Sequence, residues 1–143
     1  MARIPKVIPS VLRFGIGALF LYAGAVKAAD PAGFAGEIDH YHLLPWEAVI
    51  ALALYLPWLE VICGGALFFP RFKRASLWLL LLLMLVFLMA LGSAWARGLD
   101  IRCGCFGSTA AGSSVPLAIL RDIGILGAIL YVFIRDAGSP GVN

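Results

Sequence analysis

Charged residues are scarce in this sequence. Only 13% of its 143 residues are Asp, Glu, Lys or Arg, whereas 62% are hydrophobic. A soluble domain carries about 25% charged residues. A chain of this length also has too little interior to hide so much apolar surface. The composition therefore excludes an ordinary soluble fold and indicates that lipid surrounds much of the chain.

Several motifs of soluble enzymes are also missing. The sequence has no glycine-rich phosphate loop, no HExxH and no GxSxG, so nothing in it indicates nucleotide binding, zinc proteolysis or serine hydrolysis. The net charge is +3, but the basic residues lie at the ends of apolar runs, where topology signals belong. We therefore expect the lipid bilayer, and no nucleic acid, as a partner.

Long apolar runs are what the sequence does contain. The third is the clearest, because WLLLLLMLVFLMALG lies in a stretch long enough to cross a hydrocarbon core of about 30 Å. Asp30 and Pro31 end the first run, since the residue before a proline avoids the helical conformation. A secretory signal peptide is the alternative for that run, because residues 25–29 loosely resemble a cleavage site. The expected spans of one membrane domain, 1–143, are 9–26, 47–69, 76–96 and 115–134.

The positions of the basic residues predict the topology. Arg and Lys gather before the first run, between the second and third, and after the fourth, which is one side if every run crosses. The positive-inside rule makes that side the cytoplasm. We expect an all-α, antiparallel four-helix transmembrane bundle in a bacterial-type inner membrane, with both termini inside. Loops 28–46 and 97–114 then lie at the outer face.

The first outer loop carries a short helical pattern. Phe34, Ile38 and Tyr41 are spaced three to four residues apart, which favours a short helix lying in the membrane interface.

Cys103 and Cys105 are the leading candidates for function. On the outer face disulfides form and persist. With only Gly104 between them, the two sulfurs would meet in a small, strained ring, and strain makes a disulfide labile and suited to exchange. The pattern favours a thiol–disulfide oxidoreductase that trades electrons with an extracytoplasmic thiol protein or a membrane quinone. Cys63, deep in the second run, is expected to be a buried, inert thiol.

Nearby cations are expected to assist these thiols. Arg97 and Arg102 belong to the same segment, and Lys27 is expected to emerge on the same face. A cation beside a thiol raises the thiolate fraction. The alternative is that these side chains only contact lipid headgroups and solvent.

Ionisable residues inside the spans are costly and usually face the bundle interior. Asp122 lies early in the fourth run, so it is expected to pair with Lys27 or to take protons during thiol exchange. Glu60 lies on the inner half of the second run and is expected to pair with Arg13. A purely structural ion-pair role stays open for both carboxylates.

Two alternative functions remain. His40 and His42 are expected on the same outer face as Cys103 and Cys105, and two imidazoles with two thiolates suit zinc, copper(I) or mercury(II). Neither HxH nor CxC has the usual spacing of a structural zinc site, so metal binding or transfer ranks below thiol exchange. The third alternative is a non-catalytic scaffold subunit of a membrane complex.

Three segments resemble a known family: GIGALFLYAGAVKAADPAGFAGEIDHYHLLP, LPWLEVICGGAL and ARGLDIRCGCFG resemble the MauE branch of the DoxX-like membrane proteins. CGCFG is the most specific element. The resemblance implies a four-helix inner-membrane protein associated with thiol–disulfide redox. It implies Cys103 and Cys105 as the redox pair and Lys27 and Glu60 as the family's charged positions. MauE-type proteins are linked with maturing the disulfide-rich small subunit of methylamine dehydrogenase, and other DoxX-like proteins with quinone-coupled sulfur oxidation.

Overall fold

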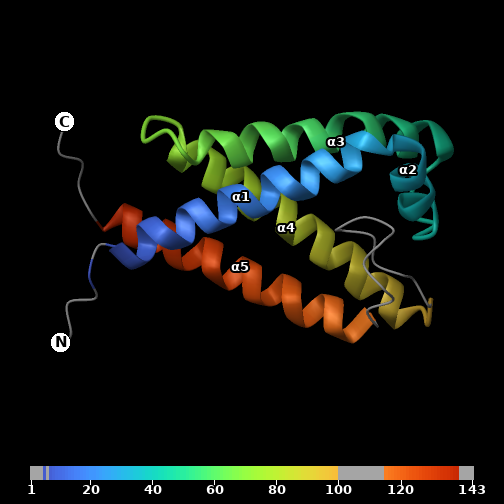
Figure 1. The fold of residues 1–143 in the computed structure, drawn as a ribbon. Coiled ribbons are helices and arrows are strands. Elements are labelled where there is room, and N and C mark those ends of the chain that lie inside the picture. Colours follow the sequence, from blue (N-terminus) through green and yellow to red (C-terminus); the bar gives the residue numbers. More distant parts are fainter. Residues whose placement is uncertain (1–4, 6, 100–114, 139–143) are drawn as a thin grey trace.

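The described part of the chain is entirely helical. The computed structural model describes residue 5, residues 7–99 and residues 115–138, and these contain helices and no strand. Four of the helices are long and apolar enough to cross a membrane, which confirms the predicted all-α, multi-pass membrane architecture. Figure 1 shows the helices in chain order: α1 Val7–Ala29, α2 Pro31–Asp39, α3 Trp46–Ala66, α4 Lys73–Ala96 and α5 Val115–Ala137.

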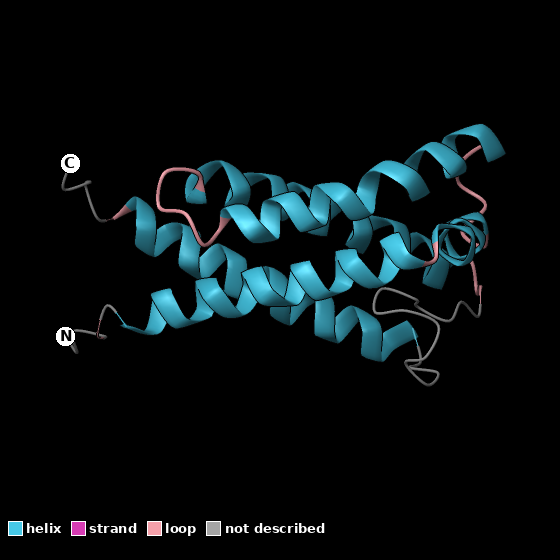
Figure 2. Cartoon of the chain, turned by 45° about the horizontal axis from the view of Figure 1, so that its top comes forward, coloured by secondary structure: helices cyan, strands magenta, loops and turns pink. Residues whose placement is uncertain are grey.

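The four long helices form a closed ring. Helix α1 packs against α3 and α5, and α4 packs against the same two helices from the other side. The described connections between α1, α3 and α4 lie at the ends of the bundle (Figure 2), and the end of α5 lies beside the start of α4, so each long helix runs antiparallel to its neighbours. This arrangement confirms the predicted antiparallel bundle.

The closest pair of helices is α1 and α3, and glycine makes their approach possible. A Cβ atom on Gly17 would lie 2.8 Å from the backbone oxygen of Gly64, and one on Gly24 would lie 2.7 Å from the backbone oxygen of Pro57. Only glycine fits where two membrane helices touch backbone to backbone. These contacts fix the register of α1 against α3, and that register decides which polar side chains meet.

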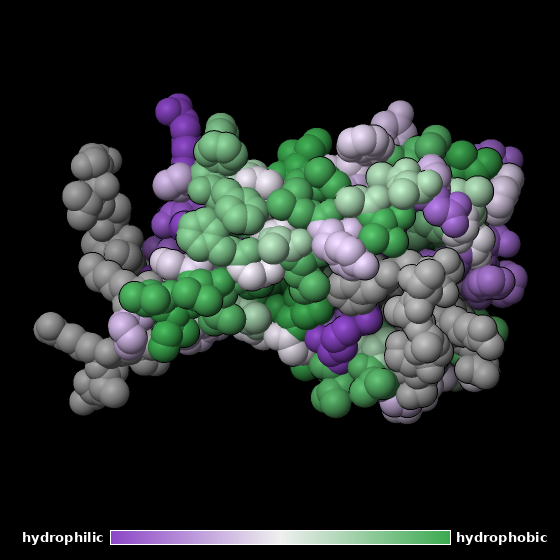
Figure 3. Space-filling model, viewed as in Figure 1, coloured by the Kyte–Doolittle hydropathy of each residue, from purple (hydrophilic) through white to green (hydrophobic). Residues whose placement is uncertain are grey.

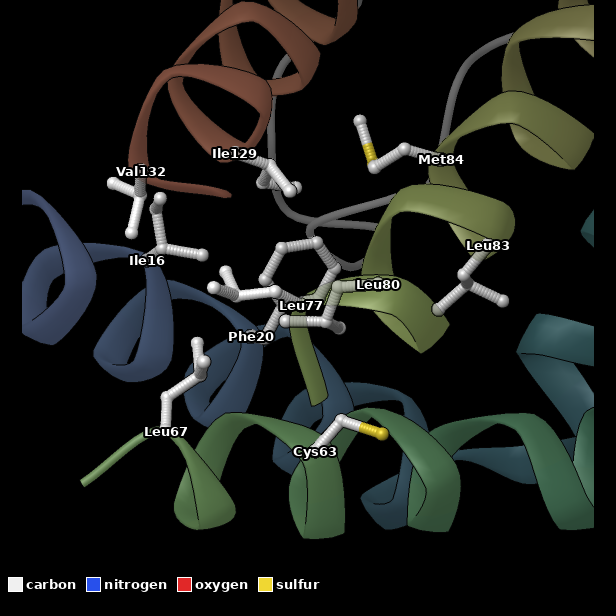
Figure 4. Close-up of a cluster of buried hydrophobic side chains, with 10 residues drawn as sticks. All are labelled: Ile16, Phe20, Cys63, Leu67, Leu77, Leu80, Leu83, Met84, Ile129 and Val132. Carbon is white, nitrogen blue, oxygen red and sulfur yellow. The ribbon is translucent and has the colours of Figure 1, made fainter. Parts of the chain in front are cut away.

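An apolar core fills the ring, and apolar side chains also cover its outside. Figure 4 shows the core residues pointing inward from α1, α3, α4 and α5, with Cys63 among them. Large apolar residues such as Trp58, Ile62 and Met89 are exposed on the outside, and hydrophobic residues dominate much of the face seen in Figure 3. Lipid is the surrounding that such a surface requires.

Helix α2 confirms the short helix predicted in the first outer loop. Asp30 caps it, because its Oδ1 accepts a hydrogen bond of 3.0 Å from the backbone N–H of Gly33. Pro31 opens the helix, where its missing N–H costs nothing. Phe34 and Ala35 are buried and pack with Val49 and Ala53 of α3. Helix α2 therefore lies against the α3 end of the bundle.

Different contacts mark the two ends of the bundle. At one end, Lys73 Nζ of α4 lies 3.2 Å from Asp136 Oδ1 of α5, so the basic turn before α4 and the end of α5 are neighbours. At the other end, the Arg97 guanidinium donates to the backbone oxygen of Tyr41, and Tyr41 packs against Leu91 of α4 and Ala118 of α5. The basic turn before α4 therefore lies at the end of the bundle opposite to α2 and the last turn of α4, which agrees with the predicted separation of these two ends.

Some helix boundaries differ from the sequence prediction. Helix α1 extends to Ala29, past the predicted end at 26, so Lys27 belongs to the helix. Helix α3 stops at Ala66, short of the predicted 69, because the backbone N–H groups of Phe68 and Phe69 donate three residues back and form turns. Helix α4 begins at Lys73, one turn before the predicted 76, and α5 runs to Ala137 beyond the predicted 134.

Candidate functional site

Three charged side chains from three helices line one small cavity inside the bundle. Lys27 of α1, Glu60 of α3 and Asp122 of α5 are only 4%, 1% and 3% exposed. Helix α4 supplies Met84 and Phe87 to the same wall. All four long helices thus meet at this cavity, where three buried charged side chains stand in a largely apolar lining, and this makes it the strongest candidate site among the described residues.

Lys27 and Glu60 form a buried ion pair. The ammonium of Lys27 donates to both carboxylate oxygens of Glu60, at 2.8 and 3.1 Å. It also lies 5.1 Å from the ring centroids of both Phe34 and Phe87. Two charge-assisted hydrogen bonds and two aromatic faces offset the cost of removing these charges from water.

The α1–α3 register brings this pair together. Side chains in a helix lean toward its N-terminus. Because α1 and α3 are antiparallel and Gly24 lies opposite Pro57, Lys27 and Glu60 lean toward each other from either side of that contact. Gly24 is five residues before the end of α1, so at 1.5 Å per residue the pair lies about 8 Å below that end.

Asp122 is held by its neighbour in sequence. The Nε and Nη2 atoms of Arg121 donate to Asp122 Oδ1, at 3.1 and 2.9 Å. The side chain of Arg121 is 30% exposed, whereas that of Asp122 is 5% exposed. Arg121 therefore approaches the carboxylate from the edge of the bundle. Arg121 was not among the site residues predicted from the sequence. Its position beside Asp122 in an apolar run was the signal that could have identified it.

Two predicted partnerships are wrong. Glu60 pairs with Lys27 and not with Arg13; the Arg13 guanidinium instead lies 5.0 Å from the centroid of the Phe14 ring, and its Nε has no hydrogen-bond partner. The hydrogen bonds to Asp122 come from Arg121 and not from Lys27, although Lys27 and Asp122 line the same cavity. Lys27 was expected at the outer rim, but α1 continues past it and its side chain leans inward.

Arg97 ties two elements together at the α2 end. Its Nη2 donates to the backbone oxygen of Tyr41, and its Nε donates to the backbone oxygen of Ser93 at 3.4 Å. The guanidinium therefore fastens the chain after α2 to the last turn of α4. Cys103, Cys105 and Arg102 lie outside the described residues, so their predicted roles stay predictions.

His40 and His42 are both exposed in the turn that follows α2. The backbone N–H of His40 donates to Gly36, and His42 adopts a left-handed backbone with φ of 48°. In the part of the chain that the structure describes, no three side chains of His, Cys, Asp or Glu lie close enough together to hold a metal ion. The predicted metal site also needs both cysteines of the 97–114 connection, so it stays a prediction.

Cys63 is buried as predicted. It is a free thiol, 3% exposed, inside the apolar core of Figure 4. Its burial agrees with the expected inert thiol, and it provides a matched control for experiments on the other two cysteines.

Known proteins resemble the chain over nearly its whole length. A family model described as "Methylamine utilisation protein MauE" matches residues 5–135. The chain is also 33% identical over 129 residues to the methylamine utilization protein MauE of Methylophilus methylotrophus, a match that covers 88% of this chain and 68% of that protein. No solved structure matches the chain.

Proposed function

Because this chain belongs to the MauE family, we propose that it is a membrane redox protein of methylamine utilisation whose Cys103 and Cys105 exchange disulfides with an extracytoplasmic partner. It resides in the inner membrane, and the cysteine-bearing connection faces outward. Its wider relation to the DoxX-like proteins is part of the same proposal.

One observation carries this proposal: the two helix ends that bracket the cysteines lie away from the basic end of the bundle. Helix α4 ends at Ala96 and α5 begins at Val115, beside the turn that follows α2, while the Lys73–Asp136 bridge marks the opposite end. Basic residues favour the cytoplasmic side. The connection 97–114 would then face a compartment in which disulfides persist.

The exchange conserves atoms and electrons. A thiolate of the pair attacks one sulfur of a partner disulfide, forming a mixed disulfide and releasing the partner's other sulfur as a thiolate. The second cysteine attacks the mixed disulfide, which leaves Cys103–Cys105 oxidised and the partner reduced by two electrons. The reverse sequence oxidises a partner dithiol. A membrane quinone or a soluble thiol protein returns the pair to its starting state.

The neighbouring cations support the reactive thiolate. Arg97 caps α4 and is six positions before Cys103, and Arg102 precedes it directly. Positive charge near a thiol raises its thiolate fraction at neutral pH. Lys27 is not available for this task in the described structure, because Glu60 and two phenyl rings enclose its ammonium.

Single cysteine variants test the proposal. Cys103→Ser or Cys105→Ser leaves one thiol without its resolving neighbour, so at least one variant should accumulate a mixed disulfide with a partner in cells growing on methylamine. Non-reducing electrophoresis and mass spectrometry of the purified adduct identify it, and a thiol reductant should release it.

Matched controls separate the alternatives. Cys63→Ser should trap no adduct, because Cys63 is buried in the core. When His40→Ala and His42→Ala are added to the single-cysteine variant, the mixed disulfide should still accumulate. A metal-transfer protein would instead lose its activity when both histidines are replaced. Full growth on methylamine of the Cys103→Ser/Cys105→Ser variant would contradict thiol exchange and favour a scaffold role.

A further inference from the structure

We propose that one corner of the bundle binds the headgroup of an anionic phospholipid, whose phosphate accepts hydrogen bonds from the Arg13 guanidinium. The corner lies at the basic end, where the start of α1, the connection 67–72 between α3 and α4, and the end of α5 lie together (Figures 1 and 2). Every group in it belongs to a described residue. The inference therefore depends neither on Cys103 and Cys105 nor on which compartment this end faces.

Arg13 lies beside the connection between α3 and α4. Gly17 follows Arg13 by four residues and therefore lies on nearly the same face of α1, one turn further into the bundle. A Cβ atom on Gly17 would lie 3.1 Å from Cε2 of Phe68, the second residue of the connection. The Phe68 ring also packs against the Phe14 ring, with 5.3 Å between their centroids. The connection thus covers the face of α1 next to Arg13.

The end of α5 borders the same corner. Ile16 and Val132 belong to one core cluster and lie side by side in Figure 4. Arg13 is three residues before Ile16. Asp136 is four residues after Val132. Because α1 and α5 are antiparallel, both charged residues lie about one turn from that contact, toward the basic end. Lys73, at the start of α4, donates to Asp136 Oδ1 at 3.2 Å and closes the corner.

Two buried polar atoms in this corner lack a hydrogen-bond partner among the described residues: Arg13 Nε and Asp136 Oδ2. The Arg13 guanidinium instead faces the Phe14 ring, 5.0 Å from its centroid. A buried donor and a buried acceptor without partners are costly, so each indicates a partner from outside the protein. The headgroup of phosphatidylglycerol offers both kinds of partner, a phosphate that accepts and hydroxyl groups that donate. Rotation of the two side chains toward the lipid brings these atoms to the headgroup.

Charge favours an anionic lipid over a zwitterionic one. The described residues at this end include five basic side chains and one acidic side chain, a net charge of +4. They are Arg13, Arg71, Lys73, Arg74, Arg135 and Asp136. Asp136 offsets only Lys73, with which it forms an ion pair. Basic clusters at a membrane surface attract anionic lipids, and a guanidinium can hold a phosphate with two parallel hydrogen bonds.

The depth of Arg13 matches the boundary between headgroups and acyl chains. Arg13 is six residues after Val7, the first residue of α1, so it lies about 9 Å inside that end. From there the long side chain reaches the interface while its stem stays among apolar groups. A cation inside a span is costly unless an anion joins it, and a lipid phosphate is the anion that this depth provides.

Exposed phenyl rings beside the cations accommodate the acyl chains. Phe14 is 41% exposed, and Phe69 and Phe72 of the connection are 62% and 55% exposed. Rings at this level pack against hydrocarbon, so the corner presents cations and an apolar surface together. A soluble phosphate would leave the rings uncovered, whereas a phospholipid contacts both. The ligand is therefore a lipid and not a free anion.

Native mass spectrometry of the full-length protein tests the site. The protein is released from nanodiscs that contain equal amounts of phosphatidylglycerol and phosphatidylcholine with identical acyl chains. Wild type should retain one phosphatidylglycerol in preference to phosphatidylcholine. Arg13→Gln should lower the retained phosphatidylglycerol about fivefold, the effect of losing one cation beside an anionic lipid. Arg97→Gln, which removes a cation at the opposite end, should retain it as wild type does.

Two further variants separate a specific site from a diffuse positive field. Arg74→Gln removes an exposed cation from the same end. It should lower retention less than Arg13→Gln does, because Arg74 attracts the lipid without holding its phosphate. Arg13→Lys keeps the charge but loses the paired donors of the guanidinium, so its retention should lie between those of wild type and Arg13→Gln. This variant tests the proposal even where Arg13→Gln fails to fold.

Four results would overturn the inference. Equal retention of the two lipids by wild type would show that charge does not select the ligand. Unchanged retention in Arg13→Gln and Arg13→Lys would remove Arg13 from the site. Equal losses in Arg13→Gln and Arg74→Gln would leave only a diffuse field. Displacement of the lipid by excess glycerol 3-phosphate would assign the corner to a soluble anion.

Discussion

At the scale of the residue, the molecule depends on charges that have been taken out of water. Lys27 and Glu60 are each almost fully buried and satisfy one another with two hydrogen bonds. Removing one member of such a pair leaves an uncompensated charge, whereas removing both leaves an apolar site. The free energy of unfolding should therefore fall more when one member of the pair is replaced than when both are replaced.

Lys27→Met should lower the free energy of unfolding by about 3–5 kcal/mol, because the Glu60 carboxylate loses its partner. The double variant Lys27→Met/Glu60→Leu should recover much of that loss. Thermal unfolding in detergent, followed by circular dichroism, measures both. Lys73→Met is the control, since its partly exposed pair with Asp136 contributes about 0–1 kcal/mol. Equal losses in all single variants would contradict this account.

At the scale of the element, the contact between α1 and α3 sets the register of the bundle. Hydropathy alone predicted that Gly-containing runs cross the membrane, but it did not predict which residues face each other. The pairing of Lys27 with Glu60 follows from the contact between Gly24 and Pro57 and from the lean of both side chains. The sequence prediction placed Lys27 outside the first apolar run, and it therefore gave Glu60 the wrong partner, Arg13.

Gly24→Ala should destabilise the protein by about 1–3 kcal/mol, because the added methyl group meets the Pro57 carbonyl at 2.7 Å and forces the helices apart. Gly15→Ala lies on the same helix with nothing within 4 Å of the added atom, so its thermal midpoint should stay near that of wild type. The comparison is made by circular dichroism in the same detergent. An unchanged midpoint for Gly24→Ala would mean that the helices do not touch there.

Arg97→Ala should loosen the chain after α2, because the guanidinium that holds the Tyr41 carbonyl is gone. Amide hydrogen exchange across residues 40–44 should accelerate severalfold, while exchange in the centre of α3 stays as in wild type. Arg74→Ala, at the opposite end of the bundle, is the matched control. Equal exchange of residues 40–44 in both variants would contradict a fastening role for Arg97.

At the scale of the whole molecule, sequence predicted most of the fold. Long apolar runs and basic residues at their ends were enough for the all-helical bundle and for the separation of its two ends. The cavity that Lys27, Glu60 and Asp122 line was not predictable, because it needs side chains from α1, α3, α4 and α5 at one level of the bundle. Residues 27, 60 and 122 are far apart in sequence, and only helix packing brings them together.

The proposed orientation predicts a simple labelling pattern. The test uses a background in which serine replaces all three natural cysteines. Glu47→Cys introduces a thiol at the α2 end, and Arg71→Cys introduces one in the basic turn. Both native residues are exposed. A membrane-impermeant maleimide added to spheroplasts should label residue 47 and leave residue 71 unlabelled until the membrane is opened. The reverse pattern would place the basic turn outside and would remove the compartment argument for Cys103 and Cys105.

The position of Phe34 has a mechanical consequence. Its ring belongs to the short helix α2, yet it faces the ammonium of Lys27, which is anchored to α1 and α3. Helix α2 therefore cannot swing away from the bundle without wetting the ammonium. A protein that docked at that end and displaced α2 would expose the buried ion pair of Lys27 and Glu60 to water.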